Sequence, residues 1–150
     1  ERAAAAFAAR FGAAAELPGA LSEIAARREA GEILVLATAS SAYYARHLAE
    51  RWGFDLVVAT GNRWEGDRLT PAIDGENCYG DAKLRMLLAA IPGGHPRAAF
   101  FSDHVSDMPC LLWADAPVAA NPSAPLRAEA VSRGWRIADW AAAARPAGPE

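Results

Sequence analysis

Two aspartates are the residues in this sequence whose type and spacing are best suited to chemistry. Asp103 and Asp107 lie four residues apart, at and just beyond the end of the apolar run at residues 98–102. Two carboxylates that converge near one point form the hard-oxygen site that Mg²⁺ prefers. The alternative is structural, with Asp103 closing a turn and Asp107 capping the next helix. His104 lies between them, but no second histidine stands at ligand spacing, and we do not expect zinc.

Lys83 is the second candidate, because it is the single lysine among fifteen basic residues, the rest being arginines. It falls early in a helix predicted over residues 81–91, where a cation opposes the helix macrodipole. Helix stability therefore does not explain this lysine, whereas a neighbouring phosphate or carboxylate does. The alternative is a solvated surface lysine.

Two hydroxyl side chains, Thr38 and Ser40, form the third candidate group. They stand at and just after the end of a predicted strand at residues 33–38. A hydroxyl beside free backbone N–H groups, at the start of the next helix, forms a small cradle for phosphate. An ordinary helix N-cap uses the same residue types, and the hydroxyls alone do not separate the two interpretations.

The elements that must position these residues alternate between strands and helices. Short apolar runs predict strands over residues 33–38, 54–60, 98–102, 117–120 and 135–138. Helical patterns cover residues 3–15, 22–30, 41–52, 81–91, 108–114 and 123–133, with Pro18-Gly19 as a break and Ser22 as an N-cap. Residues 63–73 predict a β-hairpin. This order predicts βαβ units in a parallel sheet, with ligands beyond the carboxyl ends of the strands.

The composition limits the classes of function. The 150 residues carry a net charge of −3, which provides no broad basic surface for nucleic acid. No apolar run approaches the ~20 residues needed to cross a bilayer, and no glycine-rich nucleotide-binding motif occurs. Cys78 and Cys110 are too few for a disulfide framework, and we expect reduced thiols in a cytoplasmic protein.

A hydroxyl, a lysine and paired acids, in this order on a βαβ framework, are suited to phosphoryl transfer. Donors bind the phosphate oxygens, the cation neutralises charge and the carboxylates hold magnesium. We therefore expect a small phosphorylated metabolite as the partner. No residue of the sequence stands out as an activated nucleophile.

Three segments of this sequence resemble motifs of the haloacid dehalogenase superfamily, in its phosphoserine-phosphatase-like branch. The segments are residues 34–40, 78–83 and 101–111, similar to the second, third and fourth motifs, and the resemblance covers about residues 17–140. It implies an α/β fold, with a Rossmann-like three-layer parallel sheet and a small β-hairpin. The implied domains are a residual cap helix at 1–16, a partial core at 17–140 and a flexible tail at 141–150.

The resemblance also implies roles for individual residues. Thr38, with Ala39 and Ser40, corresponds to the phosphate-binding segment of the second motif. Lys83 corresponds to the lysine that neutralises the phosphate and the catalytic aspartate. Asp103 corresponds to the metal-binding and catalytic carboxylate of the fourth motif, and Asp107 lies beside it on the metal. The implied cofactor is Mg²⁺.

The sequence departs from the family pattern in two ways. Ser102, His104 and Ser106 replace the usual glycine, serine and asparagine of the fourth motif, which changes the hydrogen bonds around the carboxylates. The first motif, DxDxT, which carries the aspartate nucleophile, does not occur. In the family its strand lies between the strand that ends at Thr38 and the strand that ends at Ser102.

We therefore expect this chain to be part of a longer protein and to be inactive alone. Its own N-terminal segment or a second chain would then complete the sheet. The leading interpretation is a Mg²⁺-dependent phosphomonoester hydrolase. The alternative is a non-catalytic domain of the same fold that binds phosphate or a protein. No nucleic-acid or membrane partner is expected.

Overall fold

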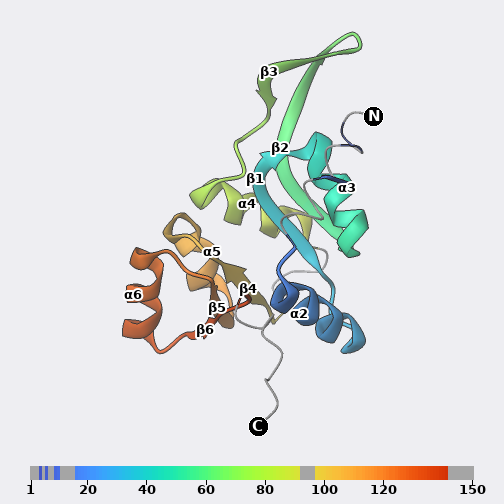
Figure 1. The fold of residues 1–150 in the computed structure, drawn as a ribbon. Coiled ribbons are helices and arrows are strands. Elements are labelled where there is room, and N and C mark those ends of the chain that lie inside the picture. Colours follow the sequence, from blue (N-terminus) through green and yellow to red (C-terminus); the bar gives the residue numbers. More distant parts are fainter. Residues whose placement is uncertain (1–3, 5, 7–8, 11–15, 92–96, 142–150) are drawn as a thin grey trace.

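The computed structural model describes residues 16–91 and 97–141, together with residues 4, 6, 9 and 10 (Figure 1). Most of the helix predicted over residues 3–15 and nearly all of the tail from residue 141 lie outside the described residues. No helix in the described part of the chain is long and apolar enough to span a membrane.

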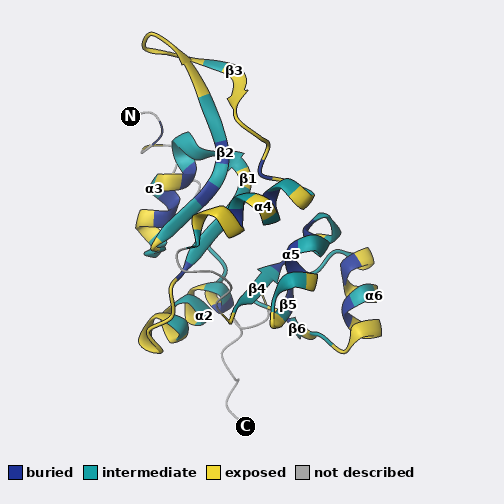
Figure 2. Cartoon of the chain, turned by 180° about the vertical axis from the view of Figure 1, so that it is seen from behind, coloured by how far each residue is buried: buried dark blue, intermediate teal, exposed yellow. Residues whose placement is uncertain are grey.

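The first sheet has three strands in the order β1-β2-β3. Strand β1 (Val35–Ser41) pairs in parallel with the first half of β2 (Leu56–Glu65). The second half of β2 continues beyond β1 and pairs antiparallel with β3 (Arg68–Asp74), which forms the predicted hairpin. The hairpin projects away from the helices in Figure 1. It is largely exposed, because only the lower part of β2 has helices packed against it (Figure 2).

Helix α3 (Ala42–Trp52) makes the crossover between β1 and β2. Its N-cap is Ser41, whose hydroxyl accepts a hydrogen bond from the backbone N–H of Tyr43 at 3.3 Å. It ends at Gly53, which adopts the left-handed conformation (φ 71°) that glycine enters without steric cost. The helix thus begins after an N-cap hydroxyl and ends at a glycine, within one residue of the bounds predicted from the sequence.

The second sheet also has three strands, in the order β4-β5-β6, and all are parallel. The strands are β4 (Ala99–Ser102), β5 (Ala116–Ala120) and β6 (Arg136–Ala138). Helices α5 (Met108–Trp113) and α6 (Ala124–Arg133) make the two crossovers. Their apolar faces pack on the sheet around Leu111, Ala119, Leu126 and Ala130, none of which has any exposed surface. This arrangement confirms the predicted α/β architecture.

Within the described residues, strands β1 and β4 each have a hydrogen-bonded neighbour on one side only, and no pairing joins the two sheets. Helix α4 (Gly80–Ala90) connects the sheets by packing instead. Leu87 of α4 and Val58 of β2 belong to an apolar cluster that also takes in Val35 of β1 and Phe100 of β4. The two sheets are therefore held together by a shared core rather than by a continuous ladder.

Helix α2 (Pro18–Glu29) differs from the prediction at its start. Pro18 and Gly19 open this helix, with Leu17 at the N-cap, whereas the sequence predicts its start at Ser22. Proline is favoured at the first helical position, because the N–H that it lacks has no partner there. The predicted N-cap Ser22 is wrong for the same reason: its hydroxyl donates to the carbonyl of Pro18 at 3.0 Å, inside the helix.

Candidate active site

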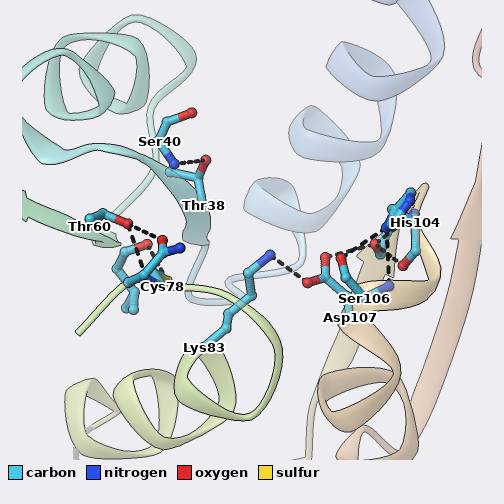
Figure 3. A network of polar contacts seen from close by, with 11 residues as sticks. Thr38, Ser40, Thr60, Cys78, Lys83, His104, Ser106 and Asp107 are labelled. Carbon is cyan, nitrogen blue, oxygen red and sulfur yellow. Dashed lines mark hydrogen bonds and ion pairs between the residues drawn. The ribbon is translucent and has the colours of Figure 1, made fainter.

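Lys83 and Asp107 form a buried ion pair at the carboxyl end of β4 (Figure 3). The Nζ of Lys83 lies 2.5 Å from Oδ1 of Asp107, and the two side chains are only 8% and 12% exposed. Lys83 stands in the first turn of α4, and Asp107 precedes α5. The interpretation of Lys83 as a solvated surface lysine is therefore wrong.

Ser102 supports this pair from the end of β4. Its hydroxyl lies 2.8 Å from the second carboxylate oxygen of Asp107 and 3.2 Å from the backbone N–H of His104. The side chain is buried, so its hydrogen bonds stand in a low-dielectric environment. Ser102 was not predicted as a site residue, although its place directly before Asp103 at a strand end is a signal for one.

His104 closes the turn that follows β4. Its Nδ1 accepts the backbone N–H of Ser106 at 3.1 Å and lies 3.0 Å from the Ser106 hydroxyl (Figure 3). Two of the three substituted positions of the fourth motif, His104 and Ser106, thus contact each other at a short 3-10 turn over Val105–Asp107. This turn directs Asp107 toward Lys83, so the altered residues preserve a defined loop by hydrogen bonds of their own.

Asp103 is exposed, and no hydrogen bond or ion pair of its carboxylate occurs within the described part of the chain. Its backbone carbonyl accepts the N–H of Ser123 at 2.8 Å, which anchors the loop to the start of α6. The alternative of two capping aspartates is not supported. Asp107 occupies the N-cap position of α5 without a side-chain cap hydrogen bond, and Asp103 closes no turn with its side chain.

Thr38 and Ser40 lie in β1, at the same edge of the fold. The Thr38 hydroxyl accepts the backbone N–H of Ser40 at 3.1 Å. Neither residue is the N-cap of α3, which is Ser41, so the N-cap alternative for Thr38 is wrong. Accepting this bond leaves the hydroxyl proton of Thr38 free to donate. In Figure 3 both residues stand on the β1 side of the Lys83 ammonium, opposite Asp107.

Thr60 connects β1 to the loop before α4. Its hydroxyl lies 2.8 Å from the backbone carbonyl of Ala39 and 3.0 Å from the Asn77 side-chain oxygen, and it accepts the N–H of Cys78 at 3.1 Å. Thr60 is 6% exposed. This buried hydroxyl sets the distance between the Thr38–Ser40 segment and the helix that carries Lys83. The sequence contains no local signal for it.

Cys78 and Cys110 are fully buried near the Lys83–Asp107 pair. Burial raises the pKa of the Cys78 thiol, although the positive charge of Lys83 acts in the opposite direction. Burial raises the pKa of the Cys110 thiol to about 12, because the thiolate would lose its solvation. Neither thiol has the character of a nucleophile.

The structure thus brings Lys83 and Asp107 into contact, and it leaves Asp103 at the same strand end with its carboxylate exposed. Mg²⁺ is usually held by one or two carboxylates, together with waters and substrate phosphate oxygens. Asp103 and Asp107 fit that donor set. No group of three or more acidic, histidine or cysteine side chains suited to a metal occurs among the described residues.

Comparison with known proteins identifies the family to which this chain belongs. Residues 1–112 match the family of haloacid dehalogenase-like hydrolases, and the chain belongs to this family. The expected family is therefore confirmed.

Two named relatives are similar to most of the chain. The inhibition of morphological differentiation protein of Streptomyces azureus is 33% identical over 124 residues, which cover 81% of the chain and 45% of that protein. A phosphoserine phosphatase of Mycobacterium tuberculosis (strain H37Rv) is 32% identical over 122 residues, which cover 79% of the chain and 40% of that protein. The chain thus spans less than half the length of these relatives.

Solved structures agree with this fold. A protein of unknown function from Bordetella pertussis Tohama I aligns with a TM-score of 0.81 and 28% identity, over 91% of this chain and 66% of that one. A probable phosphoserine phosphatase from Vibrio cholerae aligns with a TM-score of 0.59 and 18% identity, over 71% of this chain and 34% of that one. The second likeness supports the fold alone.

Proposed function

We propose that this chain forms the greater part of the active site of a Mg²⁺-dependent phosphomonoester hydrolase. The observation that carries the proposal is the buried ion pair of Lys83 and Asp107 beside the exposed carboxylate of Asp103. Family membership and the relative named as a phosphoserine phosphatase support the reaction class. A cytoplasmic location is part of the proposal.

Each residue has a distinct task in this proposal. The Thr38 hydroxyl, together with Ala39 and Ser40, binds the phosphate oxygens. The Lys83 ammonium neutralises charge on the phosphate. Asp103 and Asp107 hold the magnesium ion, which supplies Lewis-acid stabilisation of the phosphate oxygens when bound. Asp107 does so while its carboxylate remains oriented by Lys83 and Ser102.

We further propose that an additional strand lies between β1 and β4 and supplies the aspartate nucleophile. It would come from another segment of the same protein or from a second chain. The single-sided pairing of β1 and β4 supports this, because unpaired backbone groups inside a fold are costly. The chain alone, without DxDxT, would then not hydrolyse phosphate esters.

The test uses the whole protein that contains this chain. We expect hydrolysis of p-nitrophenyl phosphate with Mg²⁺, loss of activity with EDTA, and a loss of at least about a hundredfold in Asp103→Asn. Asp67→Asn, at the exposed hairpin turn, is the matched charge control and should keep full activity. Hydrolysis that persists in EDTA would contradict the proposal. Binding of inorganic phosphate without turnover would favour the non-catalytic alternative.

A further inference from the structure

A hollow of about 500 Å³ opens at the base of the β2–β3 hairpin. The N-terminal turn of α3 forms one wall, with Tyr43 and Tyr44, and the hairpin forms the other, with Leu69 and Ile73. Leu69 and Ile73 are 38% and 44% exposed, which is high for large apolar side chains. The volume is within the ~300–1,000 Å³ range of small-molecule sites.

The hollow begins at the proposed phosphate-binding segment. Ala39 lines it and stands in β1 between Thr38 and Ser40. Thr60 also lines it, and its hydroxyl lies 2.8 Å from the carbonyl of Ala39. Consecutive residues of a strand are ~3.3 Å apart. In the proposed function, the phosphate at Thr38 would stand one residue from this rim of the hollow, and the rest of its ester would extend into it.

Asn62 provides an oriented polar group in the wall. Its side-chain oxygen accepts the backbone N–H of Tyr43 at 2.8 Å and the Ser41 hydroxyl at 2.9 Å. Because a backbone N–H can only donate, the amide atom facing Tyr43 must be the oxygen, and the NH₂ group of Asn62 points away from it. Within the described part of the chain that NH₂ group has no hydrogen bond. It is available to donate to a ligand oxygen.

None of the described residues that line the hollow is charged. An amino acid such as serine carries an ammonium and a carboxylate, and both require charged or strongly polar partners when they leave water. The lining combines two tyrosines and two large aliphatic side chains with uncharged polar residues. It therefore favours an uncharged body with an apolar or aromatic part. The polar residues are Ser41, Thr60, Asn62, Thr70 and Asn77. One amide NH₂ group suits a single acceptor oxygen on that body.

We propose that this hollow binds the alcohol portion of the substrate, and that this portion is an uncharged group with an apolar or aromatic body rather than an amino acid. The inference rests on the proposed function, which places the phosphate group of the substrate at Thr38. It assigns Ile73, Leu69 and Asn62 as specificity-determining residues.

The test compares two phosphonates, which resist hydrolysis, on the whole protein. By calorimetry we expect 1-naphthylmethylphosphonate to bind at least about tenfold more tightly than 2-amino-4-phosphonobutanoate. Ile73→Glu should weaken binding of the naphthyl compound at least about tenfold, because a charge enters an apolar wall. Ile33→Glu is the matched control, since Ile33 is 67% exposed and does not line the hollow. It should leave both affinities unchanged.

The outcomes separate the two proposals. Equal or tighter binding of the amino-acid phosphonate, or equal losses in Ile73→Glu and Ile33→Glu, would overturn the inference about the hollow. The proposed function would still stand if p-nitrophenyl phosphate were hydrolysed with Mg²⁺. Conversely, absence of any phosphatase activity would count against the proposed function. If the naphthyl compound still bound more tightly, and Ile73→Glu removed this preference, the hollow would still be supported as its binding site.

Discussion

The ammonium of Lys83 lies 2.5 Å from the carboxylate of Asp107, and this contact joins the two halves of the molecule. Lys83 belongs to α4, which packs against β1 and β2, while Asp107 follows β4 of the second sheet. The described residues contain no strand pairing between these sheets. The pair is therefore both a structural link and the centre of the proposed site.

Breaking this pair should destabilise the protein strongly. Asp107→Asn or Lys83→Met leaves one charge buried without its partner, and we expect a loss of about 3–5 kcal/mol in the free energy of unfolding. The double variant Lys83→Met with Asp107→Leu should lose less than either single variant, because no charge remains to be desolvated. Urea unfolding measures the free energy of unfolding of the two kinds of single variant and of the double variant.

The control for this prediction is another ion pair of α4. Arg85 and Glu76 also form an ion pair, but their side chains are 61% and 56% exposed. Arg85→Met should cost about 1 kcal/mol or less. A similar loss in Arg85→Met and Lys83→Met would refute the idea that burial makes the Lys83–Asp107 pair critical.

The two cysteines should be inert in the native protein. Burial raises the pKa of both thiols, that of Cys110 to about 12, and neither has exposed surface. We expect no reaction with a thiol reagent at pH 8 and two equivalents of reaction in denaturant. Rapid labelling of Cys78 in the native state would show that the α4 region opens readily.

Glu23 should make the stability of the protein depend on pH in the acidic range. Its carboxylate bonds to Arg136 of β6 at 2.9 Å and to Arg27 within α2, and these bonds lower its pKa below the ordinary 4.5. A lowered pKa in the folded state stabilises the protein above pH 4.5, and this contribution is lost as the pH falls below that value.

Thermal unfolding between pH 3 and pH 7 tests the predicted contribution of Glu23 to stability. In Glu23→Gln the melting temperature should fall at neutral pH and vary less with acidification than in the parent. Glu129→Gln, which removes an exposed pair with Arg133 inside α6, serves as the control and should keep the parent's profile. An unchanged pH profile in Glu23→Gln would disprove the prediction.

Gly61 should be required for the hairpin. A Cβ at this position would stand 2.3 Å from the backbone oxygen of Asp74, which is closer than atoms can approach. Gly61→Ala should therefore separate β2 from β3 and speed hydrogen exchange of the hairpin amides, with a cost of about 1–3 kcal/mol. Gly66→Asn, at the turn, is the control, because asparagine tolerates the positive φ of that residue.

Much of the architecture could be predicted from local sequence, because it depends on local signals. Apolar runs of strand length predict the strands, and Gly53 and Gly134, both in the left-handed conformation, end helices α3 and α6. The helix start at Pro18 was missed, since proline both breaks helices and opens them. The candidates Thr38, Lys83, Asp103 and Asp107 were identified from residue type and position.

The sequence by itself determined the order of strands and helices and the residue types available for chemistry, because periodicity and capping act over a few residues. The tertiary structure decided which side chains meet. The contact of Lys83 with Asp107, the linking role of Thr60 and the hollow beside Asn62 depend on segments about twenty residues apart in the chain. The packing of sheets and helices brings these segments together, and no local pattern encodes that packing.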